Sequence, residues 1–234
     1  MSTSSRTPNV KKSGFADLPT TDAVSKKELI LHAAFRLLME KGYKNTSYSD
    51  IAYESNCTRA LVQYYYPKKD YFITAFVDRL LEAVDEQVRS RGLMTGSCFA
   101  DFSITGHLYF NFLLANERLR PLALDLIAYR ETSLINIERM EAWQHHYPEL
   151  DDLDDALVLD AVLFAAGGAH ELIYHHLMHD TPIDLHLLLA RTISSYALLL
   201  GFGQETVDDL LKRPPLDNAV INEANAELLR IMSV

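Results

Sequence analysis

Apolar residues recur at helical spacing along most of the chain. The pattern begins at Ser25, a candidate N-cap, and continues through Leu29, Ala33 and Leu37 until Gly42 ends it. We find no convincing strand alternation, hairpin dipeptide or internal repeat in the sequence. The pattern therefore predicts an all-α protein.

The predicted helices differ in length along the chain. Two short helices are expected at 47–55 and 58–65, with a turn at Asn56 and Cys57 between them and Pro67 after them. The later helices are mostly longer, and we place them at 69–91, 99–115, 119–146 (with a break near Arg130), 153–179, 183–201, 206–211 and 219–232. Residues 1–24 hold few large apolar side chains and are expected to form a flexible tail.

Charge is distributed unevenly along the chain. Residues 1–80 carry twelve Lys or Arg and eight Asp or Glu, whereas residues 81–234 carry ten and twenty-four. The total of −10 therefore hides a basic N-terminal part and an acidic remainder. Such a molecule can contact a polyanion with one end only, although chance scatter of a few charges remains an alternative.

Composition narrows the class of protein further. The chain has 234 residues, 48% of them hydrophobic and 23% charged, as in ordinary globular proteins. The two cysteines, Cys57 and Cys98, are too few for a disulfide framework or a cysteine-based zinc finger. We see no apolar run of about eighteen residues and no signal-peptide core near the N-terminus. A soluble, cytoplasmic protein with no membrane partner is expected.

The two short helices and the helix before them form a recognisable constellation. Short helices joined by a tight turn are the parts of a helix-turn-helix module, whose second helix enters the major groove of DNA. In the helix at 58–65, Arg59 and Gln63 suit guanine and adenine edges. Leu61 and Val62 are placed to pack inward. The segment 46–72 is therefore a candidate DNA reader.

Residues 26–81 resemble the DNA-binding domain of the tetracycline-repressor (TetR) family. The resemblance is carried by these residues: Gly42, Tyr43, Thr46, Ile51, Ala52, Tyr64, Tyr65, Tyr66, Pro67 and Lys69. Two positions depart from the family pattern. Asn56 replaces the usual turn glycine but tolerates a left-handed backbone, and Gln63 replaces a common aromatic residue, which makes an unusual operator preference an expectation.

The resemblance implies a role for each matching side chain of the reader. Base edges would be approached by Thr58, Arg59, Ala60 and Gln63. Phosphates would be held by Thr46, Tyr48, Tyr64, Tyr65 and Lys69. Tyr66 is expected in the core, and packing against the first helix remains an equal alternative for Tyr64 and Tyr65.

The resemblance also implies a domain plan: a tail at 1–24, a DNA-binding domain at 25–70 and an all-helical domain at 71–234 that binds a ligand and dimerises. The homodimer would form through the helices at 153–179 and 183–201, where small residues such as Gly167 and Gly168 allow close approach. The alternative is that both helices are core of one monomer. Candidate pocket residues are Phe102, His107, Phe110, Tyr129, Trp143, Phe164, His170 and Tyr174, although any single one is more often a plain core or surface residue.

Histidines cluster on the predicted helix at 153–179. His175 and His179 are four residues apart and share a face, which permits metal binding. No cysteine or acidic residue completes a ligand set at matching spacing, so solvated or interface histidines are the better interpretation. We predict neither a metal nor a cofactor.

Three functions are consistent with these patterns. The leading expectation is a ligand-responsive regulator, a dimeric repressor released from a palindromic DNA operator by a small-molecule effector. An all-helical enzyme is a weaker alternative, because the sequence holds no P-loop, dinucleotide motif, HExxH or ordered Ser/His/Asp set. A non-sensing DNA-binding adaptor of the same fold would have a filled core in place of a cavity.

Overall fold

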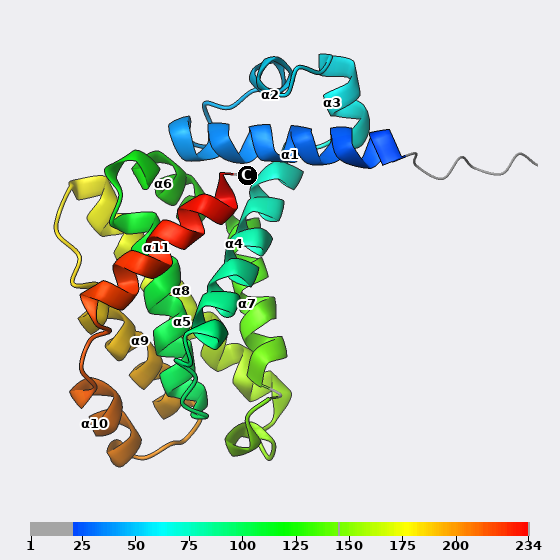
Figure 1. The fold of residues 1–234 in the computed structure, drawn as a ribbon. Helices are drawn as coiled ribbons and strands as arrows, with labels where there is room; N and C mark the ends of the chain where they lie inside the picture. The colour runs from blue at the N-terminus through cyan, green and yellow to red at the C-terminus, as the bar shows by residue number, and fades with distance from the viewer. Residues whose placement is uncertain (1–20, 145, 234) are drawn as a thin grey trace, which may run out of the picture.

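The computed structural model describes residues 21–144 and 146–233 and shows an all-helical molecule (Figure 1). No strand occurs in these ranges, so the predicted fold class is confirmed. The helices are α1 (Thr21–Lys41), α2 (Tyr48–Glu54), α3 (Arg59–Tyr65), α4 (Asp70–Ser90), α5 (Cys98–Leu114), α6 (Arg120–Ala128), α7 (Arg130–Gln144), α8 (Asp155–His179), α9 (Leu185–Leu199), α10 (Gln204–Lys212) and α11 (Asn218–Met232). Two short 3₁₀ turns, Glu117–Leu119 and Pro148–Leu150, precede α6 and α8.

The ends of the short helices follow from local side-chain chemistry. Ser47 caps α2 in a capping box with Asp50, and Thr58 caps α3 by accepting from the Leu61 amide at 3.2 Å. Asn56 between them has φ of 51°, the left-handed conformation expected for the turn. One N-cap prediction was wrong: α1 begins at Thr21, so Ser25 lies inside the helix. Most of the predicted flexible tail, residues 1–20, lies outside the described residues.

The helices form two stacked parts. α1 lies across the top with α2 and α3 above it, and α4 descends from beneath α1 into a bundle formed with the later helices (Figure 1). α1 contacts α4, α6 and α11, and within the bundle α9 packs against α5, α8 and α10. The short α1–α3 unit therefore rests on a larger helical body.

A continuous apolar core joins these two parts. Ile51 and Val62 under the short helices belong to the same buried cluster as Phe76 on α4 and Ile173 on α8. A second cluster lies farther along the body around Phe99, Phe102 and Tyr196. Displacement of α4 would therefore disturb packing in both parts.

The composition of α8 differs from the expectation that no segment is long and apolar enough to span a membrane. Within the described ranges it is the one helix long and apolar enough to cross a membrane, with a mean hydropathy of 1.6 over its best 18-residue window. A third of that window is buried inside the protein, and core helices of soluble proteins pass the same test. The observation is weak evidence for a membrane span.

Candidate nucleic-acid interface and central cavity

The polar face of α3 points away from the protein. Thr58, Arg59, Ala60 and Gln63 are all exposed, as is the ring of Tyr64 at 77%. Val62 on the opposite face is completely buried, and the half-buried Leu61 flanks it. The residues expected to approach base edges therefore share one solvent-facing surface.

Two of the side chains expected to hold phosphates are engaged inside the protein. Thr46 is only 2% exposed, and its hydroxyl donates to the Gly42 carbonyl at 2.7 Å. The half-buried Tyr48 donates its hydroxyl to the Tyr66 carbonyl at 2.8 Å. Phosphate contacts by these two side chains are not supported, because both hydroxyls already bridge the segments that frame the short helices.

Lys69 is also anchored. Its ammonium donates to the Tyr43 carbonyl at 2.6 Å and lies 4.1 Å from the centre of the Tyr43 ring. Burial lowers the pKa of Lys69. Its charge therefore stabilises the junction between the α1–α2 loop and α4, and one of its three donors is used within the protein.

The tyrosines at the end of α3 behave differently from one another. Tyr64 is exposed, Tyr65 is half-buried, and their rings meet edge to face at 5.3 Å. Tyr66 is 7% exposed and packs on Phe72 at 4.8 Å, in the core as expected. Tyr64 and the exposed edge of Tyr65 remain available for contacts outside the protein.

Sequence reasoning missed two exposed side chains beside α3. Tyr53 on α2 is 89% exposed, the most exposed of the large apolar or aromatic side chains described. Lys68, directly before α4, is also exposed. The signal for Lys68 was its place next to Pro67, whereas Tyr53 was overlooked because tyrosines near apolar positions usually belong to the core.

Below the reader, a polar junction joins the α1–α2 loop to the body. Asp125 on α6 is buried, accepts from the Lys44 amide at 3.0 Å and pairs with the Lys44 ammonium at 3.4 Å.

Tyr43 donates its hydroxyl to Asp70 on α4, and burial followed by this bond raises the pKa of Tyr43. Tyr129 lies against Tyr43 with ring centres 5.5 Å apart. Tyr129 thus belongs to this junction, and it is not among the residues that line the central cavity described next.

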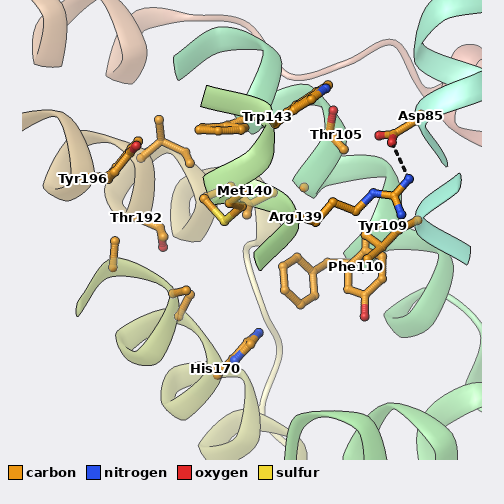
Figure 2. Close-up of a pocket in the computed structure, with 18 residues that line it drawn as sticks. Asp85, Thr105, Tyr109, Phe110, Arg139, Met140, Trp143, His170, Thr192 and Tyr196 are labelled. Carbon is orange, nitrogen blue, oxygen red and sulfur yellow. Dashed lines mark hydrogen bonds and ion pairs between the residues drawn. The ribbon is translucent and has the colours of Figure 1, made fainter. Parts of the chain in front are cut away.

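The body holds a partly open cavity of about 120 Å³ between α4, α5, α7, α8 and α9 (Figure 2). Four predicted pocket residues surround it: Phe102, Phe110, Trp143 and His170. The other side chains that contribute to it are mostly aliphatic and include Leu81, Met140, Ala166, Leu189 and Ile193. The sequence did not single out these aliphatic residues, because any helical core offers many of them.

Three other predicted pocket residues lie elsewhere. His107 is buried beside His186, with ring centres 6.3 Å apart. Phe164 is 70% exposed on the outer face of α8. Tyr174 lines an open groove between α7 and α8, next to the cavity but outside it. Each shares the helix of a cavity residue, so helical periodicity alone could not separate them.

The cavity wall is mostly apolar and holds one ion pair together with His170 and several hydroxyl groups. The Arg139 guanidinium lies 2.9 Å from the Asp85 carboxylate, and Figure 2 shows this pair at one side of the space. The Thr192 hydroxyl donates to the Leu188 carbonyl at 2.8 Å. Burial lowers the pKa of His170, which favours its neutral form.

The clustered histidines on α8 form no metal site within the described residues. His175 and His179 stack with ring centres 4.2 Å apart, and His179 Nδ1 lies 2.8 Å from the His175 carbonyl. No group of three or more possible metal ligands occurs in the described ranges.

Fold and site together define the class. Three N-terminal helices that present a short polar-faced helix to solvent, on a larger helical body, are a helix-turn-helix DNA-binding protein. Residues 30–75 match the family model described as "Bacterial regulatory proteins, tetR family". The match spans α1 to the start of α4, and for this segment it supports the resemblance found in the sequence.

Solved structures with a similar fold include regulators from several organisms. The fatty acid degradation regulator FadR from Bacillus halodurans is 20% identical, with a TM-score of 0.49 over 74% of this chain and 97% of that chain. A TetR transcription regulator from Haloarcula marismortui is 22% identical, with a TM-score of 0.45 over 76% and 97%. No curated protein matched the sequence.

Proposed function

We propose that the protein is a dimeric repressor that reads a palindromic operator with α3 and is released by a small molecule bound in the central cavity. The exposed polar face of α3 is the observation that carries the proposal, because Val62 fixes the opposite face in the core. Arg59 fits a guanine edge and Gln63 an adenine edge, while Thr58 and Ala60 suit a thymine methyl group.

Contacts to the DNA backbone would come from side chains that surround α3. Tyr64 and Tyr65 at its end, Tyr53 on α2 and Lys68 before α4 are all at least partly exposed. Tyrosine hydroxyls and lysine ammonium groups suit phosphate oxygens and would set the register of α3 in the groove. We leave Thr46, Tyr48 and Lys69 out of this set because their polar groups bond within the protein.

A homodimer through α8 and α9 is supported by the apolar face these helices leave uncovered. Phe164 and Leu172 on α8 are 70% and 54% exposed, and Leu198 on α9 is 51% exposed. A side chain built at Gly167 or Gly168 would meet nothing within 4 Å, so another helix can approach closely there. Apolar patches of this kind mark protein interfaces, and two readers would then contact two half-sites.

We keep the division into residues 25–70 for DNA binding and 71–234 for ligand binding and dimerisation. α4 links these functions, since Phe72 at its start packs beneath the reader while Leu81 and Asp85 line the cavity. A ligand releases DNA only if it binds better to the conformation in which the two readers no longer match the half-site spacing.

The alternatives carry less support. A non-sensing adaptor of the same fold would have no use for the central cavity. We assign no catalytic role: the polar groups on the cavity walls are an internally neutralised ion pair, His170 and the hydroxyls of two threonines and two tyrosines. In a bacterial cell, DNA binding would place the protein in the cytoplasm.

The proposal is tested by selecting genomic fragments with the purified protein and sequencing what is retained. A palindromic motif supports a dimeric, site-specific regulator, whereas retention of random fragments contradicts it. On the selected site, Arg59→Ala should weaken binding by about 1–3 kcal/mol and relax specificity at one base pair. Arg89→Ala, in the last turn of α4, is the matched control and should leave binding unchanged.

A further inference from the structure

The size of the cavity limits what it can hold. Its volume is about 120 Å³, and an engineered apolar protein cavity of about 150 Å³ binds benzene. The space is therefore no larger than a single ring needs, and because it is partly open, a small substituent could extend out of it. Phe102 and Trp143, with ring centres 5.3 Å apart and planes at 33°, border it together with Phe110. Flat aromatic walls favour a flat occupant.

The charges around the cavity cancel. Among the described lining residues, Asp85 and Arg139 alone carry full charges, and they pair at 2.9 Å. The Asp85 side chain is 12% exposed and that of Arg139 is 34% exposed. One nitrogen of Arg139 bonds Asp85, so a ligand carboxylate on the guanidinium would bring a second negative charge beside the mostly buried Asp85, and a ligand cation on Asp85 would bring a second positive charge beside Arg139. Both costs select against a charged occupant.

His170 supplies a polar contact that is not already used. Its ring lies 6.1 Å from that of Phe110, and no hydrogen bond to its nitrogens is found among the described side chains. In Figure 2 it projects from α8 toward the Phe110 side of the space. His170 also borders the open groove between α7 and α8, which gives a route from solvent. Thr105 and Tyr196 also line the cavity, and their hydroxyls are buried without a hydrogen-bond partner among the described residues.

We propose that the cavity binds an uncharged, single-ring molecule with one hydrogen-bonding substituent, which pairs with His170. The proposal depends on the proposed function at one point only, where this molecule is identified as the effector. Binding itself follows from the volume, the cancelled charges and the available imidazole.

Two isosteric pairs of probes test the charge preference: benzamide against benzoate, and benzyl alcohol against benzylammonium. Trp143 is the single tryptophan of the chain and lines the cavity, so its fluorescence reports occupancy directly. At neutral pH, each neutral probe should bind at least about tenfold more tightly than its charged isostere. Equal or tighter binding of a charged probe, or no binding of any probe, overturns the proposal.

Substitutions test whether the probes bind in this cavity. Ala166→Leu fills the cavity and should abolish the benzamide response, whereas Ala156→Leu on the exposed first turn of α8 should retain it. His170→Phe should weaken benzamide several-fold and leave toluene unchanged; an unchanged benzamide affinity contradicts the role of His170. Binding of the same protein preparation to its selected DNA is measured in parallel. Retained DNA binding without probe binding overturns the ligand class alone, and loss of specific DNA binding overturns the proposed function.

Discussion

At the scale of single residues, Asp125 joins the body to the reader. It is 6% exposed and accepts from the Lys44 amide at 3.0 Å while pairing with the Lys44 ammonium. Asp125→Ala leaves a backbone donor near the junction without its acceptor. We expect a loss of about 1–3 kcal/mol in the free energy of unfolding, measured by urea denaturation.

Lys44→Ala is the matched control for this prediction. The Lys44 side chain is 73% exposed, and its removal leaves the backbone bond to Asp125 in place. An exposed ion pair contributes about 0–1 kcal/mol. If both variants lose the same free energy of unfolding, Asp125 stabilises the protein through its ion pair with the exposed Lys44 ammonium and not through the backbone hydrogen bond.

His107 makes stability depend on pH. Burial first, and the neighbouring His186 second, lower its pKa in the folded protein below the usual value of about 6.5. The unfolded chain therefore binds the proton more readily, so the free energy of unfolding should fall as pH drops below about 6.5, by at most about 1.4 kcal/mol per pH unit for this group. Denaturation midpoints across this range should show a shallower slope for His107→Gln. The exposed His146→Gln is its control, and an equal change of slope in both variants would show that His107 is not the source.

The exposure of residues in the reader could be predicted from sequence where local helical spacing determines it. Thr58, Arg59, Ala60 and Gln63 lie outside because Val62 must lie inside. Lys69 and Tyr129 could not be placed in this way, since each meets Tyr43, which is distant in sequence. Contacts that depend on how helices pack leave no mark on local periodicity.

At the scale of helices, periodicity predicted the elements well and their faces less well. The expected break near Arg130 is present at Tyr129, whose extended ψ of 111° separates α6 from α7. The faces of α8 were harder to assign, because its apolar residues run all the way round. Phe164 was expected in the pocket for this reason and instead lies on the outer face with Leu172.

That outer face yields a prediction about assembly. Phe164→Asp places a charge in the proposed α8–α9 interface, where burial without a partner is costly. We expect the variant to be monomeric at concentrations at which the unaltered protein is dimeric, measured by analytical ultracentrifugation. Leu211→Asp on α10, where the leucine is 45% exposed, is the control and should not change the mass. A dimeric Phe164→Asp protein would place the interface elsewhere.

At the scale of the whole molecule, reader and body share one apolar core. The buried cluster runs from Ile51 and Val62 through α4 to Ile173 on α8, so the reader has no core separate from that of the body, which also holds a second cluster around Phe99 and Tyr196. We therefore expect one cooperative unfolding transition, although the two parts carry different functions. At a fixed protein concentration, Trp143 fluorescence reports the cavity region and far-UV circular dichroism reports all helices, so the two urea curves should coincide. If the helical signal falls in an earlier phase that Trp143 does not follow, the reader unfolds independently. Packing from α4 to α8 would then be too weak to carry a signal from the cavity to α3, and a direct route through Asp125 and α6 would have to carry it.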